Sequence, residues 1–554
     1  MGNKLKTIPQ LPPGWGYRER NRLEWWISDG GDPAELIESA LAAAGLPAHD
    51  LCDPCHSDTS NDAMPDEVTR GRDTPFQPVE FFRRPGHPGT GRTVGASLYV
   101  SAAAGAAMIG APLGAASPAP EVPDVVVIVH EAVPLDGAPP GRPLHGGNPC
   151  AEAPCGEAPC GEAPCGEAPH GEAPYGQAPC GEAPCGEAPY GTAPYGTAPH
   201  GTVRPGPAPL GGLARSAASP GAAAELAGSL GASSDAGAPA ENPLGAAVSG
   251  QPDGSDWYVG PWTSSWRPGQ HRAAVEEARR AIARGDVYQV NIVGHASAPY
   301  LGDPGPALDA VAGLPGAVWA GRLSSAQGRP GGGWAIASGS PECLVTVAGG
   351  EVVTRPIKGT GPRTEAGRAA LLASTKERAE HVMIVDLARN DLGRIATTGS
   401  VRVDELFAVR PWSGLWQAES TVRARLRPGV GVAELLRAVC PGASVTGAPK
   451  RAALDVLSAL EPVGRGPSMG ALGYVSPHGI ALGLTIRTVA AVGRGDGSGG
   501  TLHLWAGGGI TWSSNPDDEV AEAAAKAAPL DAAVRGVGQA LYRTSAGRRE
   551  KTGT

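Results

Sequence analysis

The sequence has few aromatic residues and few lysines. Aromatic residues make up 5% of its 554 residues, and only seven of its 45 basic residues are lysines. The formal net charge is -10, which argues against a protein that works by covering phosphates with basic charge. Hydrophobic residues still make up 41% of the chain, enough for a sizeable core. We therefore expect a folded protein that does not bind nucleic acid.

Several common signatures are also missing. There is no Walker A motif, Rossmann fingerprint or G-x-S-x-G motif, so nucleotide-dependent and serine-hydrolase functions lose their usual support. The N-terminus has charge but no apolar run after it, which predicts no secretory signal. The uncharged stretch 94–120 is mostly Ala and Gly with Pro112 inside, so we interpret it as packed core or loose filler instead of a membrane span. The expectation is a cytoplasmic protein without membrane contact.

Glycine and proline are abundant, with 82 and 56 residues, and many of them lie in one segment. At 148–202 a Cys, His or Tyr recurs every five positions in a Gly-Glu-Ala-Pro frame. A period of five fits neither a helix nor a strand, and the units carry no large aliphatic side chain, so 135–253 is predicted to be a disordered low-complexity insert. Its Cys and His residues could bind a soft metal, but the absence of a fold around them favours a repeat without that role.

The rest of the chain predicts a mixed α and β fold. Residues 1–134 form an N-terminal region that is part of the main fold or packed on it, 254–545 form the working domain, and 546–554 form a disordered tail. Helices are expected at 270–284, 433–439, 448–459 and 517–527, with one long or two short helices over 366–394; strands are expected at 287–296, 334–338, 343–347, 469–475, 482–491 and 502–505. Because the strands come in hairpin-like runs, antiparallel sheets covered by helices are favoured over a doubly wound parallel sheet.

Lys358 is the lysine whose surroundings suggest a role. It follows a predicted strand in Thr-Arg-Pro-Ile-Lys-Gly-Thr, where Pro and Gly mark an element boundary. A lysine can become a neutral nucleophile, which arginine cannot, so a lysine retained in an arginine-rich chain is a candidate catalytic group. A plain surface lysine is the alternative.

Two pairs of glutamates, Glu377 with Glu380 and Glu519 with Glu522, are spaced three apart on predicted helices. Each pair lies on one helix face, and two such faces together would suit a hard divalent cation such as Mg²⁺. Solvent-facing salt bridges are the alternative, and Glu522 with Lys526 has the spacing for one. The glycines 507–509 follow a predicted strand and either bring backbone amides close to an anion or form a tight turn.

Taken together, these segments resemble the chorismate-utilising enzyme family over about 286–530. The motifs that carry the resemblance are Gly-Asp-Val-Tyr-Gln-Val-Asn at 285–291, Ser-Pro-Glu at 340–342, 354–363, 377–393, 399–401, 441–450, 470–474, Ile-Arg-Thr at 486–488, 507–510 and 515–526. The resemblance implies an α+β sandwich of antiparallel sheets flanked by helices. It also implies that Mg²⁺ is bound by Glu377, Glu380, Glu519 and Glu522, and that the chorismate carboxylates are held by Ser444, Arg487, Gly508, Gly509 and Lys526.

Within this family, Pro-Ile-Lys-Gly-Thr is typical of aminodeoxychorismate synthases, whereas anthranilate and isochorismate synthases usually have Ala at the lysine position. The resemblance therefore implies that the Lys358 amine adds to ring carbon 2 while Glu342, the general acid, helps to expel the 4-hydroxyl. Ammonia then adds at carbon 4 and gives 4-amino-4-deoxychorismate. For this the pKa of Lys358 must be lowered, to which Arg355 and Arg363 would contribute. No amidotransferase cysteine motif is present, so ammonia is expected from a separate glutamine amidotransferase subunit.

Two departures and two alternatives accompany this prediction. Many relatives have His-Leu-Val-Ser where this chain has Gln-Ala-Glu-Ser at 417–420, so Gln417 replaces an imidazole, and Asp-Pro is replaced by Asn515-Pro516. One alternative function is that of anthranilate synthase component I, which Lys358 argues against. The other is a noncatalytic chorismate-binding or partner subunit, which the complete set of predicted catalytic groups argues against.

Overall fold

The computed structural model describes residues 4–5, 11, 15–52, 93–134, 257–326, 332–412 and 415–549, which belong to one compact unit of the chain. The predicted low-complexity insert and its pentapeptide repeats lie outside these residues. Within the described part of the chain, no helix is both long enough and apolar enough to cross a membrane.

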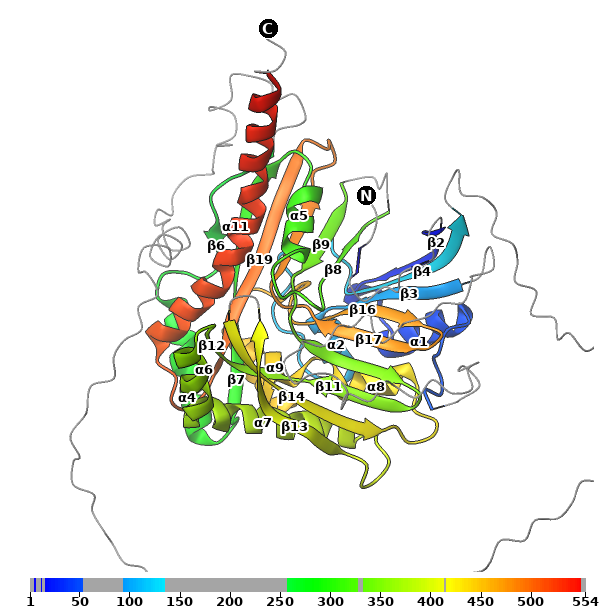
Figure 1. The fold of residues 1–554 in the computed structure, drawn as a ribbon, viewed down its shortest axis with the longest axis vertical. Helices are drawn as coiled ribbons and strands as arrows, with labels where there is room; N and C mark the ends of the chain where they lie inside the picture. The colour runs from blue at the N-terminus through cyan, green and yellow to red at the C-terminus, as the bar shows by residue number, and fades with distance from the viewer. Residues whose placement is uncertain are drawn as a thin grey trace, which may run out of the picture. The chain divides into compact units, whose positions relative to one another are not determined.

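Two antiparallel sheets form the frame of this unit (Figure 1). The first has the order β1-β8-β9-β18-β19-β7-β15, and β5 and β6 also pair with β7. Its strands are β1 (Lys4–Leu5), β5 (Tyr258–Val259), β6 (Thr263–Ser264), β7 (Gln289–Leu301), β8 (Gly321–Ser324), β9 (Trp334–Ser338), β15 (Gly447–Ala448), β18 (Thr488–Gly493) and β19 (Gly499–Ile510).

The second sheet has the order β12-β14-β11-β10-β17-β16-β3-β4-β2, and β13 also pairs with β14. Its strands are β2 (Trp15–Trp25), β3 (Thr93–Val100), β4 (Val125–Pro134), β10 (Cys343–Ala348), β11 (Glu351–Arg355), β12 (Ile357–Pro362), β13 (Arg402–Trp412), β14 (Leu415–Arg425), β16 (Ala471–Ser476) and β17 (Gly479–Leu484). Strands β2, β3 and β4 of the N-terminal region therefore continue this sheet beyond β16.

Side chains from both sheets meet in one hydrophobic core. Trp334, Ile336 and Trp505 come from the first sheet and pack in the same cluster as Leu472 and Val345 of the second. Burying apolar faces of two sheets against each other is what holds a sandwich together. The predicted α+β sandwich of antiparallel sheets flanked by helices is confirmed.

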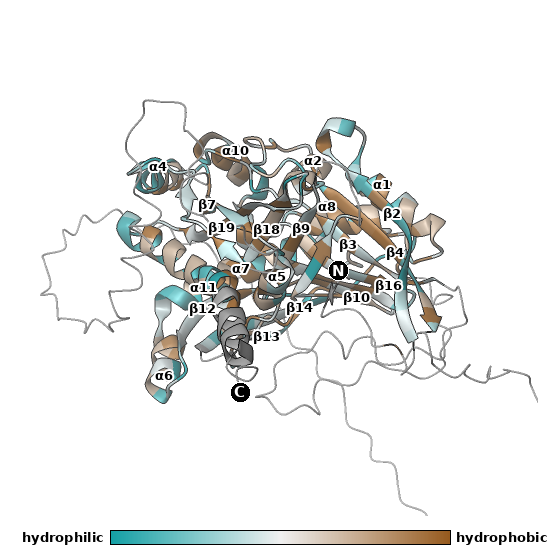
Figure 2. Ribbon diagram, turned by 90° about the horizontal axis from the view of Figure 1, so that it is seen from above, coloured by the Kyte–Doolittle hydropathy of each residue, from teal (hydrophilic) through white to brown (hydrophobic). Residues whose placement is uncertain are grey.

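Helices cover the sheets, with α11 lying along β19 (Figure 1). They are α1 (Pro33–Ala43), α2 (Ala102–Met108), α4 (Gln270–Arg284), α5 (Gly305–Ala312), α6 (Glu365–Ala373), α7 (Thr375–Gly393), α8 (Val432–Val439), α9 (Ala443–Thr446), α10 (Lys450–Leu460) and α11 (Pro516–Arg549), with a short 3-10 helix at Ile27–Asp29. Helix α4 is largely hydrophilic (Figure 2). It buries Ala274, Val275, Ala278 and Ala281 and ends at Gly285, whose φ of 84° suits a glycine cap.

The segment 94–120 contributes the buried strand β3 and helix α2, so the first of its two predicted interpretations, packed core, is the one the structure has. Other elements differ from the sequence prediction. The run 482–491 is not one strand, because β17 ends at Leu484 and β18 begins at Thr488, with Arg487 at a φ of 51° between them. Helix α11 continues to Arg549 and enters the segment predicted as a tail.

The region 366–394 forms two helices, and Ser374 separates them. Its side chain accepts a hydrogen bond from the backbone N–H of Glu377 and so caps the start of α7. The glycines 507–509 form neither a turn nor a loop: they lie inside β19 and pair with 291–293 of β7. Both features place groups of the candidate site.

Candidate active site

Glu342 is a buried acid whose position is fixed by three segments. Its side chain accepts hydrogen bonds from the Ser444 hydroxyl and from the backbone N–H of Ile357, and its own backbone N–H donates to Ser340 Oγ at 3.2 Å. It is 6% exposed. Burial raises its pKa to about 7, against the smaller opposing effects of Ser444 and Lys358. A carboxyl group in such a place keeps a proton near neutral pH and can donate it.

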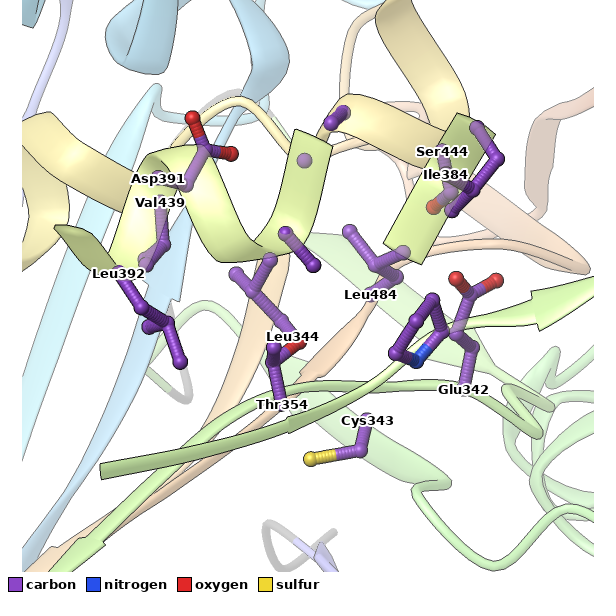
Figure 3. A pocket seen from close by; sticks show the side chains of 14 residues that line it. Glu342, Cys343, Leu344, Thr354, Ile384, Asp391, Leu392, Val439, Ser444 and Leu484 are labelled. Carbon is purple, nitrogen blue, oxygen red and sulfur yellow. The ribbon is translucent and has the colours of Figure 1, made fainter. Parts of the chain in front are cut away.

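A mostly apolar pocket adjoins this acid, between α7 and strands β10 and β11. Figure 3 shows Glu342 and Ser444 at one end, and Asp391, Leu392 and Val439 at the other. Lys358 and Arg487 are not among the residues that line it. The pocket therefore reaches the acid but does not itself contain the whole site.

Lys358 lies beside the backbone of β19 at a point where a side chain is missing. Its Nζ is 2.9 Å from the place a Cβ atom would take on Gly509, and Gln289 Nε2 is 2.7 Å from the same place. Any residue larger than glycine would push these two tips away. The structure thus brings together Lys358, Gly509 and Gln289, the last of which carries no role in the sequence prediction.

The next residue, Gly508, lies beside the acidic face of α11. A Cβ atom there would be 3.0 Å from Glu519 Oε2, 3.8 Å from Glu522 Oε1 and 3.8 Å from Lys526 Nζ. Lys526 also pairs with Glu522 at 2.6 Å and donates to the carbonyl of Gly507 at 3.0 Å. Two adjacent glycines of β19 therefore lie between the lysine of β12 and the predicted metal-binding and substrate-binding groups of α11.

The acidic face of α7 lies close both to β12 and to the end of β19. Glu377 Oε2 is 3.4 Å from the Cβ place of Gly359, the neighbour of Lys358. Glu380 accepts a hydrogen bond of 3.4 Å from Thr511, which follows β19, and Lys376 lies 3.9 Å from the same carboxyl. All four predicted metal-binding glutamates are thus near Lys358 or the end of β19.

The charges around Lys358 act in both directions. Burial lowers the pKa of its amine most, and the positive charge of Lys526 lowers it further. Glu342, Glu380 and Glu522 act to raise it. The net pKa is lowered, which favours the neutral amine. Arg355 and Arg363, which the sequence suggested for this effect, are not among its leading causes; Arg355 pairs instead with Glu419 at 3.5 Å.

The glutamates respond to burial and to each other. Burial raises the pKa of Glu380 and of Glu519, and the like charges of Glu377 and Glu522, respectively, add to this. Burial also acts to raise the pKa of Glu522, but the positive charges of Lys526, Lys358 and Lys376 together outweigh it, and the net pKa is lowered. Ser514 donates a hydrogen bond of 2.6 Å to Glu519 and orients that carboxylate.

Arg487 lies in the turn between β17 and β18. Its carbonyl accepts a hydrogen bond of 3.0 Å from Gly339, and Ser338 donates to the carbonyl of Ile486. The backbone of Arg487 therefore runs beside the segment that leads to Glu342. Burial lowers the pKa of its guanidinium.

These carboxylates have the chemistry of a Mg²⁺ site. Hard oxygen donors with repulsive neighbours, held on two helices, are suited to a divalent cation, and Mg²⁺ needs only one or two protein carboxylates. Among the residues that the structure describes, no three His, Cys, Asp or Glu side chains are already gathered as a ligand cluster. The chemistry of the donor set fits the ion.

Sequence reasoning missed two residues of this site. Gln289 is 1% exposed, and both atoms of its amide lack a hydrogen-bond partner within the described chain. A buried amide without partners is costly unless something else bonds to it. His381, next to Glu380, bonds to the backbone carbonyl of Lys358 at 3.1 Å. The residues Gln289 and His381 stand in the motifs quoted above, but only the three-dimensional pairing reveals their neighbours.

Gln417, which replaces the histidine of many relatives, is 9% exposed on β14, opposite Thr360.

Comparison with known proteins found similar sequences and a similar fold. A profile of the chorismate binding enzyme family matches residues 229–531. Aminodeoxychorismate synthase component 1 of Salmonella typhimurium is 40% identical over 271 residues, which cover 47% of this chain and 57% of that protein. Anthranilate synthase component 1 of Streptomyces coelicolor is 36% identical over 304 residues, which cover 53% of this chain and 57% of that protein. The match thus spans little more than half the length of these curated relatives.

A solved structure extends the likeness of fold to nearly the whole chain. Anthranilate synthase component I from Streptococcus pneumoniae superposes with a TM-score of 0.55, is 19% identical, and covers 94% of this chain and 93% of its own. At that identity the likeness concerns the fold alone.

Proposed function

We propose that this chain, which belongs to the chorismate binding enzyme family, aminates chorismate at ring carbon 4. The substrates would be chorismate and ammonia, and the product 4-amino-4-deoxychorismate, the precursor of 4-aminobenzoate. The observation that carries this proposal is that a base and an acid whose pKa values are shifted in opposite directions lie close together. Lys358 has a lowered pKa, and Glu342 has a pKa raised to about 7 and hydrogen-bonds to the residue before that lysine. Two titratable groups pushed towards their neutral forms suit a nucleophile and an acid.

In the first half of the reaction, the neutral Lys358 amine forms a bond from Nζ to ring carbon 2. The two conjugated ring double bonds each shift by one position towards carbon 4, and the bond between carbon 4 and its hydroxyl oxygen breaks. The Glu342 carboxylic acid gives its proton to that oxygen, which leaves as water. The lysine thereby occupies carbon 2 and leaves carbon 4 open to a second nucleophile.

In the second half, ammonia forms a bond to carbon 4 and both ring double bonds shift back. The bond from Nζ to carbon 2 breaks, and Lys358 leaves as a neutral amine. The new ammonium group returns one proton to the Glu342 carboxylate, which restores the acid. One water has been exchanged for one ammonia, so the cycle closes without an oxidant or reductant.

Holding chorismate in place is the task of the surrounding groups. Lys526, Arg487, Ser444 and the backbone amides at Gly508 and Gly509 would bind its carboxylates, because cations and amides suit these anions. The amide of Gln289 would find its missing partner in the substrate or in ammonia. Such fixed positioning supplies much of the rate gain in a reaction of this kind.

Glu377, Glu380, Glu519 and Glu522 would hold a Mg²⁺ ion. When bound, the ion supplies positive charge that keeps a substrate carboxylate in one pose. The like charges that now raise the pKa values of Glu380 and Glu519 would then be balanced.

Ammonia would come from a separate glutamine amidotransferase subunit. The support is the name component 1 carried by the relatives and the lack of a recognisable amidotransferase cysteine motif in this sequence. Ammonium salts at alkaline pH would replace that subunit in vitro.

The product of the purified chain tests the proposal. Chorismate, Mg²⁺ and ammonium at alkaline pH are expected to give a compound with the mass of 4-amino-4-deoxychorismate, which an added lyase converts to 4-aminobenzoate. The second candidate, suggested by the 36% identity to an anthranilate synthase component 1, would give fluorescent anthranilate and pyruvate. Anthranilate as the main product, or no product with intact folding, would reject the proposal.

A further inference from the structure

The strand that carries Lys358 contains an extra residue. In the pairing of β12 with β14, Ile357 lies opposite Glu419 and Thr360 lies opposite Gln417. Two residues of β12, Lys358 and Gly359, therefore lie opposite the single β14 residue between Gln417 and Glu419. Gly359 has a φ of 90°, as a glycine in such a bulge can. A bulge of this kind redirects a side chain and leaves a backbone group without its ladder partner.

His381 supplies the missing partner. Its Nδ1 is 3.1 Å from the backbone carbonyl of Lys358, and the ring is 1% exposed. Because a carbonyl only accepts, Nδ1 must carry the hydrogen. The other ring nitrogen, Nε2, then accepts from the Ser420 hydroxyl at 2.6 Å. The tautomer of the ring is thus fixed by its two partners.

Ser420 is held in turn by the neighbouring strand. Its oxygen accepts a hydrogen bond of 2.9 Å from the backbone N–H of Phe407, a residue with a φ of 57°. The Phe407 ring packs edge-on against His381, and the Arg378 guanidinium lies over the same ring, with its Cζ 4.9 Å from the ring centroid. A residue other than glycine keeps such a left-handed backbone conformation only where its surroundings hold it. The chain of contacts Phe407, Ser420, His381 and Lys358 is therefore continuous.

We propose that His381 is a positioning residue for Lys358: by donating from Nδ1 to the carbonyl of the bulge, it fixes the strand that aims the amine at the substrate. The inference rests on the proposed role of Lys358 as the nucleophile. His381 itself touches neither the reacting atoms nor the substrate in this scheme. It acts on the direction of the Lys358 side chain through the backbone carbonyl of the same residue.

Two substitutions separate this role from simple packing. His381→Asn keeps a donor at about the place of Nδ1 and loses the contact with Ser420, whereas His381→Gln keeps a polar atom near the place of Nε2 and loses the donor to Lys358. Both introduce amides of similar chemistry. His381→Gln is expected to lower kcat about tenfold with KM for chorismate nearly unchanged, and His381→Asn to stay within about threefold of the wild type. Melting temperatures of both variants identify any loss of folding.

Amine labelling gives a readout that needs no activity. The purified variants are treated briefly with acetic anhydride, and the modification of Lys358 relative to the exposed Lys376 is measured by peptide mass spectrometry. A released strand exposes its amine, so the ratio should rise by about threefold or more in His381→Gln and stay at the wild-type value in His381→Asn.

The labelling ratio decides the matter if the two readouts differ. A ratio unchanged in His381→Gln, or raised equally in both variants, would overturn the positioning role. If the wild type formed no 4-amino product, the proposed function would fall, but the labelling ratio would still confirm or reject the hold of His381 on Lys358.

Discussion

The backbone N–H of Ile357 donates a hydrogen bond to the side-chain carboxyl of Glu342. The residue before the candidate nucleophile is therefore bonded directly to the candidate acid, although fifteen positions separate them in the sequence. Strands β10 and β11 pair with each other, and β12 follows β11 after one residue. The sheet thus fixes the relation between the amine and the acid before any substrate arrives, which is what preorganisation requires.

Removing the amine should slow the reaction strongly without unfolding the protein. Lys358→Ala is expected to lower kcat by roughly a hundredfold or more, because the covalent route is lost. Lys358→Arg should not restore activity, since a guanidinium stays protonated. Kinetics with ammonium and chorismate measure this, and thermal melting is the control. A Lys358→Ala variant that aminates carbon 4 at the wild-type rate would contradict the mechanism.

Removing the acid proton should lower kcat without weakening the binding of chorismate. Glu342→Gln still accepts the hydrogen bond from Ile357 but cannot donate a proton in the same way, so kcat should fall by about 10² to 10⁴. KM for chorismate should change little. If kcat stayed at the wild-type level, Glu342 would not be the acid.

The same residue predicts a pH dependence of stability. Burial raises the pKa of Glu342 to about 7, so the folded state binds this proton more tightly than the unfolded state does. The free energy of unfolding should therefore fall as pH rises from about 4.5 to about 7, by a few kcal/mol from this group. Urea unfolding of the wild type and of Glu342→Gln across this range measures the effect. The wild type should lose stability relative to the variant as pH rises; parallel curves would contradict the buried, protonated carboxyl.

Glycines in the same strand should respond differently to alanine. A Cβ at Gly509 meets the flexible tips of Gln289 and Lys358, so Gly509→Ala should fold and lose activity. A Cβ at Gly507 would lie 2.1 Å from the backbone oxygen of Ile292, so Gly507→Ala should lower the melting temperature. Gly393→Ala at the end of α7 meets nothing within 4 Å and serves as the control. Equal effects of all three changes on activity would argue against a special role for Gly509.

The acidic face of α11 should determine the requirement for Mg²⁺. Chelation with EDTA should stop the reaction, and added Mg²⁺ should restore it. Glu519→Gln should raise the Mg²⁺ concentration for half-maximal rate by about tenfold. Glu277→Gln on α4, which breaks only exposed ion pairs with Arg280 and Arg284, should leave it unchanged. An identical requirement in both variants would remove the ion from this position.

The sequence predicted the individual helices and motifs of this site better than the contacts between them. The helix at 270–284 has an amphipathic pattern and a glycine cap, and both are local signals. The position of Gln289 beside Lys358 depends instead on the register between β7 and β19 and on the path of β12, which no local pattern encodes. The contact of His381 with the Lys358 carbonyl depends in the same way on a bulge created by the pairing of β12 with β14.

Two further differences have the same origin. The glycines 507–509 have a turn-like composition, yet they extend β19 because β7 offers a partner along its whole length. The break between β17 and β18 comes from Arg487 in a left-handed conformation, which an Ile-Arg-Thr sequence does not announce. Tertiary pairing overrides local propensity at both places, and both lie next to the candidate site.

Covalent attachment of the substrate to Lys358 is the most direct test of the account. The protein is mixed with chorismate and Mg²⁺ without ammonia, quenched in acid within milliseconds to seconds, and digested for mass spectrometry. The account predicts that the peptide containing Lys358 gains the mass of chorismate less one water, and that Glu342→Gln slows this gain. No adduct at any time in a preparation that forms 4-amino-4-deoxychorismate when ammonia is added, or an adduct on another residue, would contradict it.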